Sequence, residues 1–325
     1  MIQLKIHAVS SPLNAAFAIS RGAKTSAETI VVSLIEGGHV GRGECVPYGR
    51  YDETVDSVTD QIIDANSAII SGITREELQQ LLPAGAARCA IDCAMWDLEA
   101  KRRRIPVWKL AGLPKPEALE TTMTISLDAP QAMARAATGT PSNILKLKLG
   151  GPEDLERVEA VHNARPNAKL ILDGNEGLVA SEFPALMAAA ADLGVVLIEQ
   201  PFPAGKDDAL LRQPGHVAVC ADESVHTRAD IQPLAKKYDA VNIKLDKAGG
   251  FTEALAMVHE ARACGMGVMI GCMVAGSLSM APAFLLGGLA DLIDLDGPLW
   301  LENDIENGMK YKHGKVAPPM RKLWG

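Results

Sequence analysis

The chain has 325 residues, of which 48% are hydrophobic and 22% are charged, as is usual for globular proteins. Its formal net charge of −8 argues against a nucleic-acid partner, because binding to phosphates requires a basic surface. No apolar stretch is long enough to span a membrane, the first residues lack a secretory signal, and the six cysteines form no CxxC pair. We therefore expect a cytoplasmic protein with no membrane partner.

The first part of the chain mixes strands and helices. Residues 1–45 contain the strand-like runs LKIHAV and ETIVVSLIEGGHVGRGE, and Gly37 and Gly38 predict a hairpin turn within the second. Residues 53–112 look helical, because apolar side chains recur at helical spacing in DETVDSVTDQIIDANSAI (52–69) and more strongly in ARCAIDCAMWDLEAKRR. Two prolines then mark a boundary near residue 115.

From about residue 121, short apolar runs alternate with helical stretches. The runs are TTMTISL, NILKLKL, AKLILD, GVVLIE, HVAVCAD, AVNIKL, GVMIGC and DLIDLD. Those after the first end at positions 22 to 27 residues apart, namely Lys148, Asp173, Glu199, Asp222, Lys244, Gly271 and Asp294. Repeated strand–helix units of this length predict a parallel α/β barrel. An open doubly wound sheet alternates similarly, but eight consecutive strands with mostly polar ends favour the barrel.

The polar strand ends predict a metal site. Asp173, Glu199 and Asp222 end three consecutive strands, and the carboxyl ends of barrel strands converge on the active site. Three converging carboxylates need a cation, and an all-oxygen ligand set with open positions favours Mg²⁺. Alternatively, each could be a solvated strand end or a helix N-cap, which is harder to accept for three residues at matching positions.

Lysines on two strands predict proton transfer. Lys146 and Lys148 alternate with leucines, so both lysines point into the barrel while the leucines face the surrounding helices. Burial and the neighbouring positive charge should lower the pKa of a lysine toward that of a general base. Lys244 ends the sixth strand, diametrically opposite the second. A carbon held between Lys148 and Lys244 could lose a proton to one and regain it from the other, which is two-base epimerisation.

Two further carboxylates lie on the eighth strand. Asp294 and Asp296 alternate like the lysines and are expected to face the barrel interior, away from the metal strands. Such a pair is suited to bind a cationic group of the substrate, such as an ammonium. The alternative is a structural role in closing the barrel against Lys146.

The KxK motif, the acidic residues on three successive strands and the segment NIKLDKAGG resemble the enolase superfamily, muconate-lactonizing subgroup. The resemblance extends over the whole chain and includes the helix ARCAIDCAMWDLEAK. It implies an α/β fold with a (β/α)7β TIM-type barrel and an α+β N-terminal capping domain. The expected units are the capping domain at 1–115, the catalytic barrel at 116–302, and a tail at 303–325 that packs on the capping domain and contains a hairpin at ENGMKY.

Within that subgroup, the DxD motif resembles the dipeptide epimerases, and the segments AISRGAKTSAE and GECVPYGRY resemble bacterial L-Ala-D/L-Glu epimerases. The resemblance implies an isomerase that inverts the α-carbon of the C-terminal residue of a dipeptide through a Mg²⁺-stabilised enediolate. The family suggests that Lys148 acts on the L-face and Lys244 on the D-face, while Lys146 stabilises the enediolate. It also suggests a role in recycling cell-wall peptides.

The resemblance further implies that a capping loop supplies a cation for the side chain of the substrate. Arg21 and Lys24 are the two candidates, and Arg50 is a weaker third. The sequence leaves open the choice among them, the exact dipeptide and whether the chain forms a homo-oligomer.

Three alternatives remain beside the dipeptide epimerase. An N-acylamino acid racemase or o-succinylbenzoate synthase of the same superfamily would not need Asp294 and Asp296, because its substrate has no free ammonium. A non-catalytic barrel that serves as a binding module is disfavoured because all the expected acid, base and metal positions are filled. A lyase with a His–Asp dyad is disfavoured because the seventh strand ends in Gly271 and Cys272.

Overall fold

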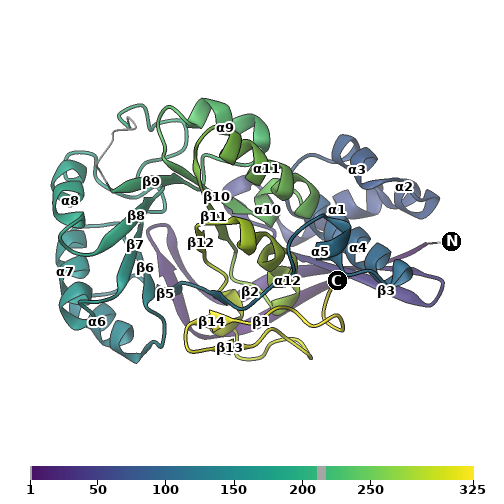
Figure 1. Ribbon diagram of the computed structural model, residues 1–325, viewed down its shortest axis with the longest axis horizontal. Helices are drawn as coiled ribbons and strands as arrows, with labels where there is room; N and C mark the ends of the chain where they lie inside the picture. Colours follow the sequence, from purple (N-terminus) through teal and green to yellow (C-terminus); the bar gives the residue numbers. More distant parts are fainter. Residues whose placement is uncertain (1, 211–216) are drawn as a thin grey trace.

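The computed structural model describes residues 2–210 and 217–325 and shows two adjoining parts (Figure 1). The N-terminal part begins with a three-stranded antiparallel sheet. Its strands are β1 (Gln3–Ile19), β2 (Gly22–Glu36) and β3 (His39–Cys45). The predicted turn at Gly37 and Gly38 joins β2 to β3, and both glycines have the positive φ that such a tight turn requires.

Two details of this part differ from the sequence-based expectation. β1 and β2 run far beyond the predicted strands, so that AISRGAKTSAE is the end of a long hairpin whose strands pair as far as Ile19 and Gly22. The predicted helix over 52–69 is divided, with Ala65 as the junction of α1 and α2. The helices that follow the sheet are η1 (Gly49–Tyr51), α1 (Val55–Asp64), α2 (Asn66–Ser71), α3 (Arg75–Leu81) and α4 (Ala86–Arg103).

Helix α4 packs closely on β3, and glycine makes this possible. A Cβ atom at Gly43 would lie 2.1 Å from the carbonyl oxygen of Ala90, so no larger residue fits there. Polar groups also join the second part of the molecule to α4. Arg88 donates hydrogen bonds to the carbonyl oxygens of Ala248 and Gly249, at 2.7 and 3.2 Å. Asp92 accepts one from the backbone N–H of Thr252 at 2.9 Å.

The second part is the predicted barrel. Eight parallel strands form one sheet in sequence order. They are β5 (Met123–Ile125), β6 (Ile144–Lys148), β7 (Lys169–Asp173), β8 (Val195–Glu199), β9 (Ala218–Ala221), β10 (Ala240–Lys244), β11 (Gly267–Gly271) and β12 (Leu292–Ile293). The sheet curls until its first and last segments meet, where Thr122 N–H donates to the carbonyl oxygen of Ile293 at 2.9 Å. The TIM-type barrel is therefore confirmed, and all eight predicted strands are present.

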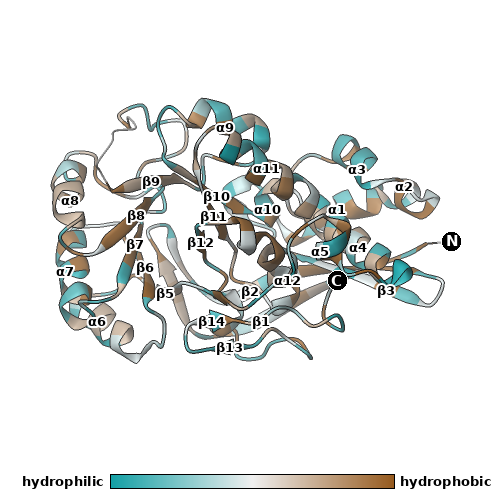
Figure 2. Cartoon of the chain, in the orientation of Figure 1, coloured by the Kyte–Doolittle hydropathy of each residue, from teal (hydrophilic) through white to brown (hydrophobic). Residues whose placement is uncertain are grey.

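Helices surround the strands on the outside (Figure 1). The helical segments of this part are α6 (Pro130–Gly139), α7 (Asp154–Ala164), α8 (Phe183–Ala190), α9 (Arg228–Leu234), α10 (Leu245–Ala248), α11 (Phe251–Ala263), α12 (Ser277–Leu286), η2 (Gly287–Leu289) and η3 (Gly297–Trp300). The strands are mostly hydrophobic and the helices turn polar faces outward (Figure 2). In β6, Leu145 and Leu147 are fully buried, as expected for a wall that is covered on both faces.

The last residues of the chain touch both parts. After α5 (Val107–Leu110), the short strand β4 (Leu119–Glu120) pairs with β14 (Lys315–Val316), which pairs with β13 (Tyr311–Lys312). The hairpin therefore turns at His313 and Gly314, which have positive φ, and not within ENGMKY as predicted. Further on, the indole N–H of Trp324 donates to the carbonyl oxygen of Cys93 in α4 at 3.1 Å. The domain limits at 115 and 302 stay a prediction.

Candidate active site

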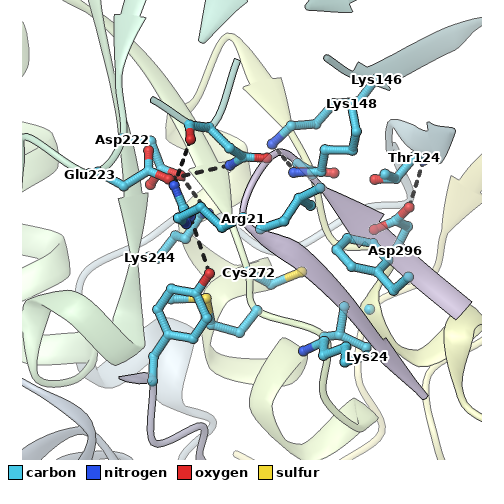
Figure 3. A pocket seen from close by; sticks show the side chains of 18 of the residues that line it. Arg21, Lys24, Thr124, Lys146, Lys148, Asp222, Glu223, Lys244, Cys272 and Asp296 are labelled. Carbon is cyan, nitrogen blue, oxygen red and sulfur yellow. Dashed lines mark hydrogen bonds and ion pairs between the residues drawn. The ribbon is translucent and has the colours of Figure 1, made fainter. Parts of the chain in front are cut away.

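The carboxyl ends of the barrel strands open into a cavity of about 250 Å³. Side chains from β6, β10 and the segments after β9 and β12 line one part of it, and the β1–β2 hairpin lines another (Figure 3). The residues predicted for the site that line this cavity are Arg21, Lys24, Lys146, Lys148, Asp222, Lys244, Asp294 and Asp296. Asp173 and Glu199 lie beneath them, fully buried at the ends of β7 and β8.

The three predicted metal ligands each face a lysine. Asp173 lies 2.5 Å from Lys148 Nζ, Glu199 lies 2.8 Å from Lys146 Nζ, and Asp222 lies 2.7 Å from Lys244 Nζ. Over the described parts of the chain, no three acidic, histidine or cysteine side chains already form a metal cage. Each of these buried carboxylates is therefore next to a positive charge, which offsets the cost of burying it.

The residues present nevertheless fit a cation. Asn175 Oδ1 and Glu223 Oε2 are buried acceptor oxygens at this end of the barrel that have no hydrogen-bond partner among the described residues. Burial, together with the charge of Asp173, raises the pKa of Glu199 to about 8. Buried oxygen acceptors with too little positive charge around them are the environment that a hard divalent ion stabilises.

Lys146 is the central cation of the site. It is 1% exposed, and its Nζ lies 3.0 Å from Asp173, 2.8 Å from Glu199 and 2.8 Å from Asp294. Burial alone would disfavour the ammonium form, but these carboxylates hold the pKa of Lys146 well above its ordinary value. Lys146 is therefore a permanent positive charge, suited to stabilising an anion.

Lys148 and Lys244 enter the cavity from the second and sixth strands, as predicted. Lys244 is 7% exposed, and Asp222 holds its pKa well above the usual range although burial opposes this. The predicted lowering of lysine pKa is therefore wrong for Lys146 and Lys244. The reason is that the charge of the facing carboxylates outweighs both burial and the repulsion between lysines.

The two carboxylates of the last strand have different partners. Asp294 pairs with Lys146 at 2.8 Å and accepts a short hydrogen bond from the Thr122 hydroxyl. Asp296 accepts hydrogen bonds from Thr124 N–H at 2.7 Å and the indole N–H of Trp300 at 3.4 Å, but it forms no ion pair with any described residue. Burial and the charge of Asp294 raise the pKa of Asp296 to about 6. Asp296 is therefore a buried carboxylate without a cationic partner in the part of the chain that the structure describes.

The candidate cations of the capping segments also differ. Arg21 binds Glu223 at 2.8 Å and Glu176 at 3.2 Å, and Arg50 also binds Glu176, at 2.8 Å. Lys24 is half-buried, lines the cavity and forms no ion pair within the described chain. Burial lowers the pKa of Lys24 to about 8. In Figure 3, Arg21 lies near Glu223, whereas Lys24 stands apart on another side of the cavity.

Sequence reasoning missed several polar residues of the site. Lys247 is 2% exposed, and its Nζ lies 2.5 Å from Asp222 Oδ1. Glu223 and Asn175 also line the cavity, and Asn175 donates to Glu223 at 3.3 Å. A signal was present, because Lys247 follows Lys244 within NIKLDKAGG. The segments DGNEG and ADES likewise extend the polar strand ends that carry Asp173 and Asp222.

A barrel with opposed lysines and buried carboxylates at its carboxyl end defines a class of enzymes that transfer protons with the help of a metal. Comparison with known families agrees with this class. Residues 1–112 match the mandelate racemase / muconate lactonizing enzyme N-terminal domain, and residues 128–322 match the enolase C-terminal domain-like family. The chain belongs to the mandelate racemase and muconate lactonizing enzyme family of the enolase superfamily, as the sequence predicted.

Several characterised proteins resemble this chain along nearly its whole length. L-Ala-D/L-Glu epimerase of Escherichia coli is 43% identical over 97% of this chain and 99% of its own. N-acetyl-D-glutamate racemase of Pseudoalteromonas sp. is 40% identical over 91% of this chain and 95% of its own. An enolase family member of Agrobacterium tumefaciens, with homology to dipeptide epimerases, was solved with sodium, L-Ala-L-Glu and an ordered loop. It matches all of both chains with a TM-score of 0.97 and 43% identity.

Proposed function

We propose that this chain is a dipeptide epimerase that inverts the α-carbon of the C-terminal residue of L-Ala-L-Glu or a close analogue. The proposal rests on two charged side chains of the cavity that have no ion-pair partner among the described residues. It rests also on the lysines that enter the cavity from opposite strands of the barrel. Among the described residues, Asp296 forms no ion pair with a cation and Lys24 forms none with an anion, and both side chains line the same cavity. A dipeptide with an acidic second residue supplies an ammonium for one and a carboxylate for the other.

Mg²⁺ is the proposed cofactor, held by Asp173, Glu199 and Asp222. Dipeptide epimerases of Enterococcus faecalis and Methylococcus capsulatus, 28% identical to this chain, were solved with Mg and a dipeptide. When bound, the cation would supply positive charge that makes the α-proton of the substrate more acidic. Binding of a cation by these carboxylates would leave Lys148 and Lys244 available for proton transfer.

In the proposed reaction, Lys148 and Lys244 act on opposite faces of the α-carbon. Lys148 takes the proton from the L-epimer and Lys244 returns one to the other face, and the roles exchange in the reverse direction. The ammonium of Lys146 is oriented toward the developing enediolate by its contacts with Asp173, Glu199 and Asp294. Because Lys146 is buried and fixed before the reaction, its charge stabilises the anion without reorganisation.

With the cation and the dipeptide bound, the charges at the site sum to zero only when one of the two catalytic lysines is neutral. The acidic side chains of the site are Asp173, Glu199, Asp222, Glu223, Asp294 and Asp296. The basic side chains are Arg21, Lys24, Lys146, Lys148, Lys244 and Lys247. These two sets are equal in number, so adding a divalent cation and a dipeptide of net charge −1 leaves one excess positive charge. Loss of a proton from one catalytic lysine removes it, and that is the state a general base requires.

A second candidate is racemisation of an N-acylated glutamate, which is favoured by the Pseudoalteromonas relative. The substrate of that reaction has no ammonium for Asp296 to bind. The test is to incubate the protein with Mg²⁺ in D₂O and either L-Ala-L-Glu or N-acetyl-L-glutamate, and to follow deuterium at the α-carbon by NMR. Faster exchange in the dipeptide supports the proposal, and exchange confined to N-acetylglutamate would replace it with the second candidate.

Cytoplasmic location is also a proposal. The described residues contain no helix long and apolar enough to cross a membrane. All six cysteines are free thiols, which agrees with a reducing compartment.

A further inference from the structure

The tip of the β1–β2 hairpin rests on the rim of the barrel, over the entrance to the cavity. Ala18 N–H donates to Ser126 Oγ at 2.7 Å, and Leu127 N–H donates to the carbonyl oxygen of Ala18 at 3.1 Å. The hydroxyl of Ser20 donates to the carbonyl oxygen of Asn175 at 2.9 Å. The tip is therefore attached to the loops that follow β5 and β7, more than a hundred residues away in sequence.

Two glycines form a notch for this tip. A Cβ atom at Gly150 would lie 2.3 Å from Ser20 Cβ, and one at Gly177 would lie 2.6 Å from it. Gly150 also has a φ of +140°, whereas Gly177 has a backbone that other residues can adopt. Glycine is therefore needed at position 177 because Ser20 approaches closely, and not because the backbone has an unusual conformation there.

Arg21 fastens the tip with charged hydrogen bonds. One nitrogen of its guanidinium donates to the Asn175 carbonyl oxygen at 2.7 Å and lies 3.2 Å from Glu176. The other donates to Glu223 at 2.8 Å and to the Tyr48 hydroxyl at 3.1 Å. Glu176 and Glu223 have side chains only 8% and 2% exposed, so these bonds are shielded from water.

We propose that Arg21 is a positioning residue that latches the hairpin over the site, and that it is not the cation that binds the substrate side chain. The proposal rests on the dipeptide epimerase function above. Arg21 is already occupied by protein groups, while Lys24, on the same hairpin, faces the cavity without an ion pair from the described residues. The latch also joins the two loops that follow Asp173 and Asp222, since Asn175 and Glu223 belong to them. Closing the hairpin therefore excludes water and brings Lys24 to the substrate in one step.

The first test compares an acidic with a neutral dipeptide. For the Arg21→Gln variant we expect kcat/KM to fall by the same factor, roughly 10- to 100-fold, for L-Ala-L-Glu and for L-Ala-L-Gln, since both need the closed hairpin. Lys24→Gln should reduce kcat/KM for L-Ala-L-Glu much more than for L-Ala-L-Gln. Arg103→Gln, which removes an exposed pair with Glu99, is the control and should change neither. A selective loss of L-Ala-L-Glu turnover in Arg21→Gln would overturn the proposal.

The second test needs no substrate. Hydrogen exchange of the amides in residues 17–24, measured by mass spectrometry, should be on the order of tenfold faster in Arg21→Gln than in the unaltered protein. Gly177→Ala should also release the tip, because the added Cβ would lie 2.6 Å from Ser20 Cβ. Unchanged exchange in Arg21→Gln would refute the latch. If the unaltered protein epimerises neither dipeptide, the proposed function fails while this exchange result still decides the latch.

Discussion

The substitution Asp296→Asn tests whether this side chain recognises the ammonium of the substrate. The replacement keeps the shape of the side chain, and its amide oxygen can still accept the 2.7 Å hydrogen bond from Thr124 N–H. The amide nitrogen would then point toward the cavity, where it presents a donor to a group that also donates. Asp296 is 5% exposed, so the lost interaction is a shielded, charge-assisted hydrogen bond.

Such a bond contributes about 1.5–3 kcal/mol, which corresponds to an increase of roughly 10- to 150-fold in KM for L-Ala-L-Glu. The change in kcat should be smaller, because Asp296 contacts neither catalytic lysine in the described structure. The assay measures initial rates of epimerisation by polarimetry, with binding of N-acetyl-L-glutamate measured by calorimetry. Asp291→Asn, which alters a surface carboxylate paired with Arg262, is the control. Equal weakening of the dipeptide and of N-acetylglutamate would show that Asp296 does not bind an ammonium.

Three further predictions concern the bases, the metal and the buried charges. Lys148→Ala and Lys244→Ala should each abolish epimerisation. Each variant should still exchange the α-hydrogen of one epimer with D₂O, because one base remains. Equal exchange of both epimers by either variant would contradict a two-base mechanism. Removing Mg²⁺ with EDTA should abolish turnover. Glu199→Gln should weaken Mg²⁺ binding, measured by calorimetry, at least about tenfold. Unaltered binding would exclude Glu199 as a ligand. Asp246 is buried, and its pKa rises from 3.8 to about 7, chiefly through burial. Folding therefore favours its protonated form, and this carboxyl lowers stability as pH rises from about 4 to 7. Asp246→Asn should accordingly raise the free energy of unfolding at pH 8 by up to about 4 kcal/mol and have little effect at pH 4, as measured by urea denaturation.

The barrel and its polar strand ends could be predicted from sequence because both depend on short-range patterns. In β6, alternation places Lys146 and Lys148 on one face and leucines on the other, and burial of both faces identifies a barrel wall. The order of the strands around a barrel then sets Lys148 opposite Lys244 without any knowledge of side-chain contacts. The same reasoning located Asp294 and Asp296, since the period of two extends past the end of β12.

The remaining features depend on contacts between residues far apart in the chain. Arg21 and Lys24 are three residues apart and chemically alike, so sequence could not choose between them. The choice that we propose rests on Glu223, about two hundred positions later, which pairs with Arg21 at 2.8 Å, whereas Lys24 forms no ion pair with a described residue. The pKa of Lys244 was misjudged for the same reason, because its sign is decided by Asp222 on the neighbouring strand. In this fold the backbone pattern determines which side chains reach the site, and the pairing among them determines which charges remain for the substrate.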